Sequence, residues 1–480
     1  MNHRPGSTVE LVSIWFTTCI LVLVTVSGPV VAQSFDWDQP TEFFRVTEAG
    51  DLQSPTLLLD AFGVAHAFWS ASPDDARYAL YYSFWDSPVW SSPIDVLASA
   101  DGDDLYPFIL QEDDGKLFVF WLTGRGIMYS SCSLDQLDNA HAWLPPELIP
   151  TSRQAWAGLG VARDPVGQWH FVYASRQLDS IRTMTCSEDL NSCAPETAVA
   201  TAPTDDTWLA YPGITAAPNG DIWLWWHELD PKGTGFGHQR AVYVRSASLG
   251  RDWSAQVGLA EGYYAANFEV REGIMVRTVV GGTGTGGRYI SFSYDSGESW
   301  TEARNIGAGA GEGMQAVRIA VDSTGTWHFV VEASMNFATI SKFSDGTWSK
   351  PAFIASASLI ESCCHTPGTT TENATIVVSD GNQLHLFFEE ANRTIWTTSR
   401  QLPAPRISAS GNPTVNAESR VSQALPTPEI PALSALPGGD LSVTRSVDGE
   451  IVPATTPVLL GLLPVLLLIC VVIVIKRGGK

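Results

Sequence analysis

The stretch VARDPVGQWHFVY, residues 161–173, decides how this chain folds. An apolar run leads into a turn that contains Asp164 and Gly167, and a second run with alternating apolar residues follows. Glycine supplies the positive φ that a tight turn needs, so the pattern predicts a β-hairpin. One hairpin does not identify a fold, but the number of times that this hairpin pattern recurs does.

The hairpin pattern occurs seven times in all. The other copies are LLLDAFGVAHAFW (57–69), LQEDDGKLFVFW (110–121), TAAPNGDIWLWW (215–226), FEVREGIMVRTVV (268–280), IAVDSTGTWHFVV (319–331) and IVVSDGNQLHLFF (376–388). With Gly167, their turn glycines lie 52 to 56 residues apart: Gly63, Gly115, Gly220, Gly273, Gly325 and Gly381. Seven copies at one period predict a repeat architecture in which each copy is one structural unit.

A second signal completes each unit between the hairpins. A short polar-aromatic run precedes a tryptophan or its replacement, as in WSSP at Trp90 and WSKP at Trp348, so each period holds the four strands of a propeller blade. The seventh hairpin has a third strand but no fourth, whereas FDWDQPTEFFRV (35–46) has the form of a fourth strand. We therefore expect an all-β, seven-bladed β-propeller over residues 33–400, with four-stranded antiparallel blades, closed by residues 37–46. A six-bladed ring is the main alternative.

The segment SFSYDSGESW, residues 291–300, predicts a turn between a third and a fourth strand. Asp295 is expected to accept hydrogen bonds from backbone N–H groups two residues on, and Gly297 to adopt positive φ. The residues expected to shape this turn are Ser293, Asp295, Gly297 and Trp300. They match the Asp box, S-x-D-x-G-x-x-W, and through it the chain resembles the sialidase-like BNR/Asp-box propellers. RSASLGRDW (245–253) and SKFSDGTW (341–348) are weaker versions of the same turn.

This resemblance covers residues 35–400 as architecture. It implies a ligand site on the face opposite the Asp-box turns, where sialidases hold three arginines that clamp a carboxylate, a Tyr–Glu pair and an aspartic acid/base. The catalytic motifs are not matched: aligning the family's first arginine motif on Pro55 places Gln53 at the arginine position. Sialidases also have six blades.

The two ends of the chain predict export and anchoring. Residues 1–32 have an apolar run followed by VVA at 30–32, which is typical of a signal peptide. Residues 401–457 are rich in Pro, Ser, Ala and Thr and predict an extended stalk. Residues 458–475 carry no charge, are long enough for one transmembrane helix, and precede the basic tail 476–480. The expected location is the cell membrane, single-pass, with the N-terminal domain extracellular.

The net charge limits the kinds of ligand that the chain can bind, and the cysteines indicate where disulfides or a metal site could form. The net charge is −23, with 51 acidic and 28 basic residues, which argues against nucleic acid as a ligand. In an exported chain Cys186 and Cys193 are expected to form a local disulfide, whereas the pairing of Cys132, Cys363 and Cys364 stays open. No second Cys or His cluster accompanies the CCH at 363–365, so we expect no metal and no cofactor.

Histidines recur soon after the turn glycine in four of the second strands. They are His66, His170, His328 and His385. Equivalent positions in different blades lie far apart around the ring, so a shared metal or acid–base site is not expected. We expect these side chains to serve packing between blades.

Function is expected in the loops that differ between copies, which are rich in acidic and aromatic residues. Aromatic rings stack on sugars and carboxylates accept from hydroxyls, so the expected partner is an extracellular glycan or glycoprotein. The candidate ligand-binding residues are Tyr106, Arg125, Arg176, Trp208, Tyr211 and His227. If the chain is instead an exo-glycosidase of the sialidase-like kind with a rearranged site, the candidate catalytic residues are Asp206, Glu228, Glu332 and Glu389. Of these, Trp208, Tyr211, His227 and Glu228 are expected to cluster near the ring's mouth.

Overall fold

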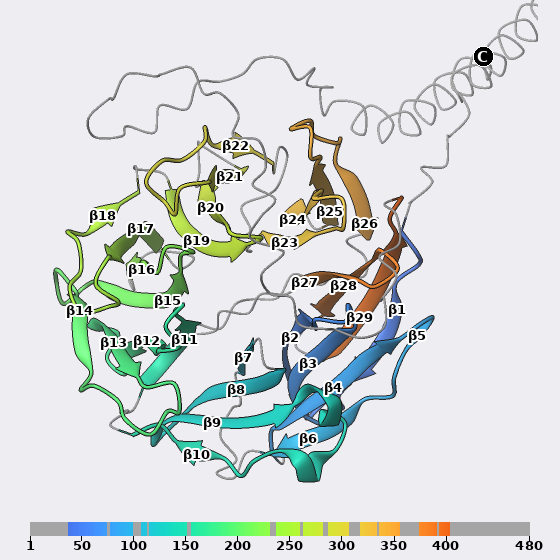
Figure 1. The fold of residues 1–480 in the computed structure, drawn as a ribbon, viewed down its shortest axis with the longest axis horizontal. Coiled ribbons are helices and arrows are strands. Elements are labelled where there is room, and N and C mark those ends of the chain that lie inside the picture. The colour runs from blue at the N-terminus through green and yellow to red at the C-terminus, as the bar shows by residue number, and fades with distance from the viewer. Residues whose placement is uncertain are drawn as a thin grey trace, which may run out of the picture. The chain divides into compact units, whose positions relative to one another are not determined.

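The computed structural model describes residues 37–73, 77–98, 107–112, 115–150, 155–230, 237–259, 263–281, 287–306, 317–333, 336–355, 374–390 and 393–403. These residues form seven antiparallel sheets arranged around a ring (Figure 1). The seven-bladed propeller predicted from the repeat is therefore confirmed, and the six-bladed alternative is excluded. The predicted signal peptide, the transmembrane helix and residues 404–457 of the predicted stalk lie outside the described residues. The stalk's expected first residues still belong to the propeller, since Gln401 ends β29 and Leu402 is buried in the core.

Each blade is built in chain order from its innermost strand outwards. Blade 1 holds β2 (Asp51–Leu59), β3 (Ala65–Ser72), β4 (Ala79–Asp86), β5 (Val89–Trp90) and β6 (Ile94–Ala98), the last two both pairing with β4. Blade 2 holds β7 (Phe108–Gln111), β8 (Lys116–Thr123), β9 (Gly126–Ser133) and β10 (Glu147–Leu148), with the short 3-10 helices η1 (Leu134–Gln136) and η2 (Ala140–Ala142) before β10. Blade 3 holds β11 (Ala155–Arg163), β12 (Trp169–Ser175), β13 (Ser180–Cys186) and β14 (Thr197–Thr201).

The remaining blades repeat this order. Blade 4 holds β15 (Trp208–Ala216), β16 (Ile222–Asp230), β17 (Gly237–Ser246) and β18 (Val257–Gly258). Blade 5 holds β19 (Tyr263–Arg271), β20 (Ile274–Gly281), β21 (Gly287–Ser293) and β22 (Arg304–Asn305). Blade 6 holds β23 (Arg318–Val321), β24 (Trp327–Ala333), β25 (Asn336–Lys342) and β26 (Ala352–Ala355). Blade 7 holds β27 (Ala374–Ser379), β28 (Gln383–Glu390), β29 (Thr394–Gln401) and, from the other end of the chain, β1 (Thr41–Arg45).

The ring closes through the N-terminal strand. β1 pairs antiparallel with β29, with Thr41 opposite Thr397 and Arg45 opposite Thr394. In Figure 1 the blue β1 lies beside the orange-red β29. The predicted closure by residues 37–46 is confirmed, and it leaves no blade with a missing outer strand.

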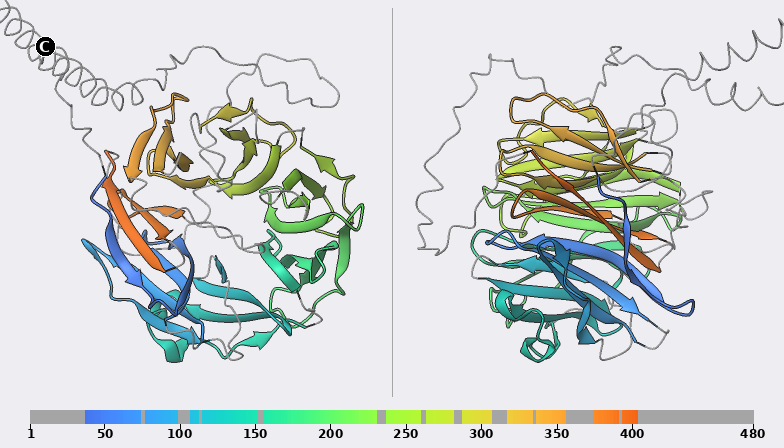
Figure 2. Two further views of the ribbon diagram at one scale, coloured as in Figure 1. Left: turned by 180° about the vertical axis from the view of Figure 1, so that it is seen from behind. Right: turned by 90° about the vertical axis from the view of Figure 1, so that its right-hand side faces the viewer.

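The core lies in the seams between blades. Alternate residues of each second strand face opposite neighbours, so the strands are apolar on both sides. In β16, Trp226 packs in the cluster shared with blade 3, whereas Trp223 packs in the cluster shared with blade 5. Seen from the edge of the ring, the sheets lie side by side (Figure 2). The hydrophobic core of the described residues is therefore divided into seven clusters, one between each pair of neighbouring blades.

The two faces of the disc carry different connections. We call the face with the loops from second to third strands and from fourth strands to the next blade the mouth face. We call the face with the turns between first and second and between third and fourth strands the turn face. The glycines of the repeated hairpins all lie on the turn face and have positive φ, for example +89° at Gly167.

The repeated histidines serve the turn face. His170 Nε2 lies 2.9 Å from Asp164 Oδ2, and the same carboxylate accepts from the backbone N–H groups of Val166 and Gln168. His328 makes the equivalent contact with Asp322 at 3.0 Å. These histidines therefore do more than pack between blades as expected, because most of the imidazoles also stabilise the turn of their own hairpin. No shared metal or acid–base site among them is needed to explain their recurrence.

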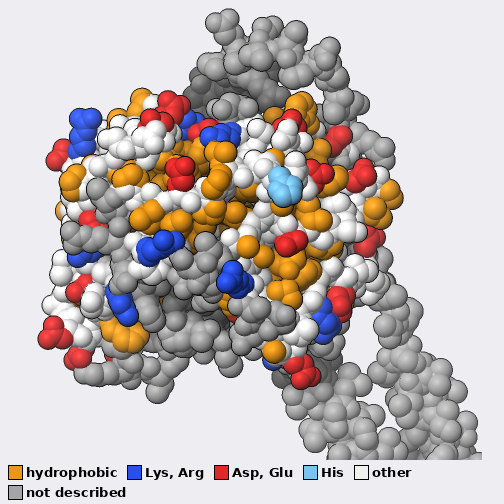
Figure 3. Space-filling model, turned by 90° about the horizontal axis from the view of Figure 1, so that it is seen from below, with side chains coloured by type: hydrophobic (Ala, Val, Ile, Leu, Met, Phe, Trp, Pro, Cys, Tyr) orange, Lys and Arg blue, Asp and Glu red, His pale blue; other side chains and the backbone are white. Residues whose placement is uncertain are grey.

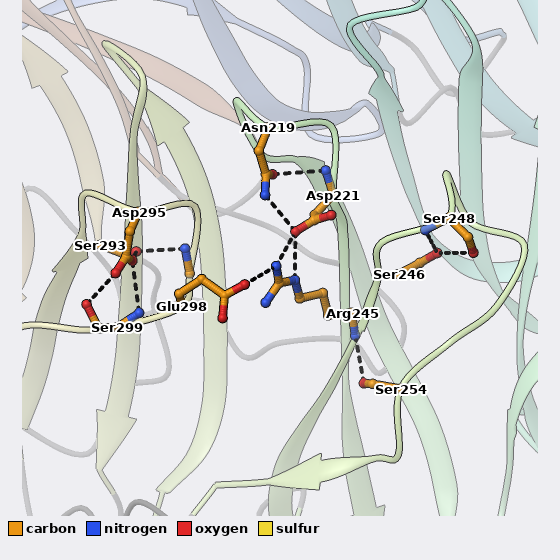
Figure 4. A network of polar contacts seen from close by, with 11 residues as sticks. Asn219, Asp221, Arg245, Ser246, Ser248, Ser254, Ser293, Asp295, Glu298 and Ser299 are labelled. Atoms are coloured by element: carbon orange, nitrogen blue, oxygen red, sulfur yellow. Dashed lines mark hydrogen bonds and ion pairs between the residues drawn. The ribbon is translucent and has the colours of Figure 1, made fainter. Parts of the chain in front are cut away.

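The turn at residues 293–300 is held by side-chain oxygens (Figure 4). Asp295 Oδ1 accepts from the backbone N–H of Ser299 at 2.9 Å and from Ser293 Oγ at 2.8 Å, while Gly297 N–H donates to Ser293 Oγ at 2.7 Å. The bonded amide lies four residues beyond Asp295, not two as the sequence suggested, since the turn is wider than an Asx turn. Trp300 packs against the seam with blade 4.

Other blades keep the geometry of this turn with different chemistry. In blade 4, Ser248 Oγ takes the acceptor role toward Asp252 N–H at 2.8 Å, and Gly250 N–H donates to Ser246 Oγ at 2.9 Å. In blade 3, the disulfide Cys186–Cys193 joins the two ends of the turn. Arg245 then links the turn faces of two blades, because it contacts both Asp221 and Glu298 (Figure 4).

Candidate functional site

The mouth face of blade 4 carries the most unusual backbone conformation in a described strand. Tyr211 has φ +51°, and it lies where β15 bulges between Ala210 and Gly213. The other described non-glycine residues with positive φ lie outside strands, in turns and loops. A bulky residue in the left-handed region is strained, and such strain collects at functional sites. Pro212 follows directly and fixes the chain on the far side of the bulge.

Aromatic side chains surround this bulge. The ring of Tyr211 lies 5.6 Å from the imidazole of His227, and Trp208 remains 36% exposed at the start of β15. Ala210 pairs with His227 and Trp208 pairs with Leu229, so Trp208 and His227 point to the same side of the sheet. This gives blade 4 a small aromatic surface at the mouth, made of Trp208, Tyr211 and His227, which we call the aromatic surface.

His227 is held as a neutral ring. Its Nε2 lies 3.3 Å from the backbone nitrogen of Ala266 and 3.4 Å from the carbonyl oxygen, in the first strand of blade 5. Enclosure of the imidazole lowers its pKa to about 4, and the contact with the Ala266 backbone opposes this only in part. At neutral pH the ring is therefore uncharged.

Glu228 does not join the aromatic surface. Because strand residues alternate, it points to the opposite side of β16 from His227. It is buried, and both of its oxygens accept from Arg240, Oε2 from Nε at 2.6 Å and Oε1 from Nη2 at 3.1 Å. The expected cluster of four residues is thus corrected to three, with Glu228 held in a bidentate ion pair on the other side of the sheet.

The other candidates lie apart. Asp206 is exposed in the loop before β15, and Arg125 and Arg176 are exposed in loops of blades 2 and 3. Glu389 is buried in β28 opposite Ile395. Tyr106 and the side chain of Glu332 lie outside the described residues. Nothing in the described part of the chain brings two of the candidate carboxylates into contact.

The partnership of Glu228 with Arg240 was missed by the sequence analysis. A bulge between Glu228 and Leu229 shifts the register of β16 against β17, so counting residues through the connection does not identify the partner. A metal centre has no support either: within the described ranges no group of three or more His, Cys, Asp or Glu side chains has ligand geometry. Those same ranges contain no helix long and apolar enough to cross a bilayer.

The rim offers a different kind of surface. Figure 3 looks onto the edge of blades 1 and 2, where the described side chains are apolar with acidic and basic ones interspersed. Exposed apolar residues in these blades include Val89, Leu144 and Leu148. This mixture lacks the planar aromatic and polar combination found at the mouth of blade 4.

Comparison with known proteins gives the following. No protein-family model and no curated protein matches the chain. Among solved structures it is similar to a protein of unknown function from Dyadobacter fermentans (12% identity, TM-score 0.46, 76% of this chain and 98% of that one). It is also similar to an ulvan lyase of polysaccharide lyase family 25 bound to its saccharide (10% identity, TM-score 0.49, 75% and 95%). A third is the Trypanosoma rangeli sialidase in complex with the inhibitor DANA (10% identity, TM-score 0.39, 75% and 59%). At these identities and TM-scores the similarities do not bear on the chemistry of this chain.

Proposed function

We propose that the chain is a cell-surface propeller that recognises an extracellular glycan or glycoprotein through the mouth face of blade 4. The observation that carries the proposal is the strained Tyr211, held beside His227 and next to the partly exposed Trp208. Aromatic rings with adjacent polar edges are the usual platform for sugar rings, which present apolar C–H faces and hydroxyl edges.

Binding fits the described geometry better than hydrolysis does. Most glycosidases need two carboxyl groups about 5 to 10 Å apart across the bond that they cleave, and a sialidase-like enzyme needs a Tyr–Glu pair together with an aspartic acid/base. Glu228 has both oxygens committed to Arg240, and the described residues do not bring it against another candidate carboxylate. Release of 4-methylumbelliferone from a panel of aryl glycosides would favour the hydrolase instead.

A printed glycan array tests the binding role. The wild type is compared with Trp208→Ala and with Tyr211→Asn, since asparagine adopts positive φ with less strain. Both variants should lose at least tenfold in signal on the glycans that the wild type selects. Tyr294→Ala is the matched control, because Tyr294 is an aromatic residue that is 63% exposed but lies on the turn face. Equal signals from all four proteins would exclude the aromatic surface as the ligand site.

Anchoring by residues 458–475 is part of the same proposal. An uncharged stretch of this length is typical of a transmembrane helix, and the basic residues after it favour a cytoplasmic tail. A chain ending at residue 457 should appear in the culture medium, whereas the full chain should sediment with membranes and be released by detergent. Recovery of the full chain in the medium would contradict the anchor.

A further inference from the structure

Blade 3 contacts the backbone of the aromatic surface just before and just after its strained residue. Two residues before Tyr211, the backbone N–H of Leu209 donates to the carbonyl oxygen of Leu178 at 2.7 Å, in the loop between the second and third strands of blade 3. Directly after Tyr211, the buried Pro212 lies against Gly158 of β11, the first strand of blade 3. The backbone at Tyr211 is therefore fixed between two contacts with the neighbouring blade.

The contact at Gly158 has no room for a side chain. Gly158 has φ +67° and lies where β11 itself bulges, between Ala157 and Leu159. A Cβ atom at this position would lie 2.8 Å from Cδ of Pro212, well inside the separation of about 3.5–4.0 Å that two carbon atoms prefer. The bulge of β15 thus packs against the bulge of β11, and a glycine is needed at the point of closest approach.

Any displacement of Pro212 acts directly on Tyr211. Cδ of a proline is bonded to the backbone nitrogen, so it cannot rotate away as the end of a flexible side chain would. That nitrogen belongs to the peptide bond that joins Tyr211 to Pro212. On the side of β15 that faces blade 5, the indole of Trp225 covers Gly213 so closely that a Cβ there would collide with the ring. Because both sides of the strand are packed, the displacement must be taken up at the bulge.

We infer that Gly158 of blade 3 is a positioning residue for the aromatic surface of blade 4. Its lack of a side chain lets Pro212 pack against β11, and this packing holds the ring of Tyr211 beside His227. The inference rests on the proposed function. A tyrosine disfavours positive φ, so it keeps this conformation only while its surroundings impose it. A ring that is already in place does not have to be ordered when the glycan binds, which strengthens binding.

A double-mutant cycle on glycan affinity tests this role. Full-length wild type, Gly158→Ala, Tyr211→Asn and the double variant are applied in dilution series to a printed array of galactose-, mannose-, N-acetylglucosamine- and sialic acid-terminated glycans, which gives an apparent Kd for each glycan. Gly158→Ala should raise the apparent Kd at least about tenfold in the wild-type background and less than about twofold in the Tyr211→Asn background, because it acts through the tyrosine.

Two further variants separate positioning from stability. Gly158→Asn should behave as Gly158→Ala does, and it replaces that variant if alanine prevents folding, because asparagine adopts positive φ with less strain but still carries a Cβ. Gly297→Ala is the matched control, since it also places a Cβ on a glycine of positive φ against a rigid ring, but on the turn face of blade 5. It should lower the melting temperature and leave every apparent Kd unchanged.

The outcomes distinguish this inference from the proposed function. Gly158 variants that bind as the wild type does, while Trp208→Ala loses binding, overturn the inference and leave the proposed function standing. Equal weakening by Gly158→Ala in both backgrounds, or an equal loss of affinity in Gly297→Ala, overturns the inference in the same way. A wild type that binds no printed glycan overturns the proposed function and this inference together.

Discussion

Deleting residues 35–46 removes the strand that closes the ring, and we expect it to destabilise the propeller strongly. Asp38 alone makes three hydrogen bonds to blade 7: its N–H donates to Ser399 O at 2.9 Å, its carbonyl accepts from Thr398 Oγ1 at 2.7 Å, and its carboxylate accepts from Ser399 Oγ at 2.6 Å. Val46 N–H donates to Arg393 O at 2.9 Å. Trp37 is 4% exposed and packs in the seam between blades 6 and 7.

The size of the effect follows from these contacts. Loss of a buried tryptophan side chain costs about 3–5 kcal/mol, and four hydrogen bonds at about 1 kcal/mol each add about 4 kcal/mol. An unfolding entropy of about 2.1 cal/mol/K per residue gives about 0.8 kcal/mol/K for the roughly 365 residues of the disc. These contributions alone should lower the melting temperature by about 9–12 °C, and the loss of the β1–β29 ladder and of the packing of Phe43 and Phe44 adds to that fall.

Thermal unfolding followed by circular dichroism measures this fall. Trp37→Ala alone should lower the melting temperature by about 4–6 °C, because it removes only the packing contribution. Glu42→Gln is the control in the same strand, since its ion pair with Arg45 is about half exposed and is worth little. A deleted chain that melts within 2 °C of the wild type would refute the reasoning that β1 is needed for closure.

Three further changes probe the turns and the buried histidines. Gly297→Ala should cost about 2–4 kcal/mol in urea unfolding, because a Cβ there would lie 2.2 Å from a tryptophan ring of blade 4 at φ +92°, whereas Gly273→Ala, with the space around it open, should cost only about 1 kcal/mol. Asp295→Ala should cost about 1–2 kcal/mol with unchanged glycan binding, and a loss of binding at constant stability would contradict its structural role. Burial raises the pKa of Asp295, but hydrogen bonds from Ser299 and Ser293 outweigh burial, and the net effect is a lowered pKa. The stability that Asp295 contributes is therefore present above about pH 4 and is lost as the pH falls below it. Burial lowers the pKa of His227 to about 4 and that of His385 to about 3. The unfolded chain binds a proton at each of these histidines near pH 6.5 and the folded chain does not, so the free energy of unfolding should fall as the pH drops from about 6.5 toward 4. His385→Gln should reduce the slope of that pH dependence by about one proton.

Much of the fold follows from the sequence because the repeat is regular. Seven turn glycines at one spacing give the number of blades, and the missing fourth strand of the last blade identifies residues 37–46 as its replacement. Both inferences depend on period and on polarity, which strands express directly. The disulfide Cys186–Cys193 is equally local, since it spans a single turn.

The site is less accessible to the same reasoning. His227 and Glu228 are neighbours in sequence, yet alternation in β16 sends them to opposite sides of the sheet, one to blade 5 and the other to Arg240. The bulge at Tyr211 and the shift after Glu228 each displace the register, and neither has a sequence signal that fixes its size. The burial of the Gln53 amide without a hydrogen-bond partner among the described residues likewise appears only when both strands and the neighbouring blade are in place.

The closure of the ring has a consequence for how the protein is made. Thr41 pairs with Thr397, so the first strand to leave the ribosome waits for nearly the last. At the usual 5–20 residues per second, the roughly 350 residues between them take ~20–70 s to synthesise. Throughout that time Phe43 lacks its neighbour Phe387 of blade 7. At the end of it, six complete blades form an open arc whose two terminal seams are still uncovered. The nascent chain is therefore most exposed to wrong partners just before β29 is made and the ring can close.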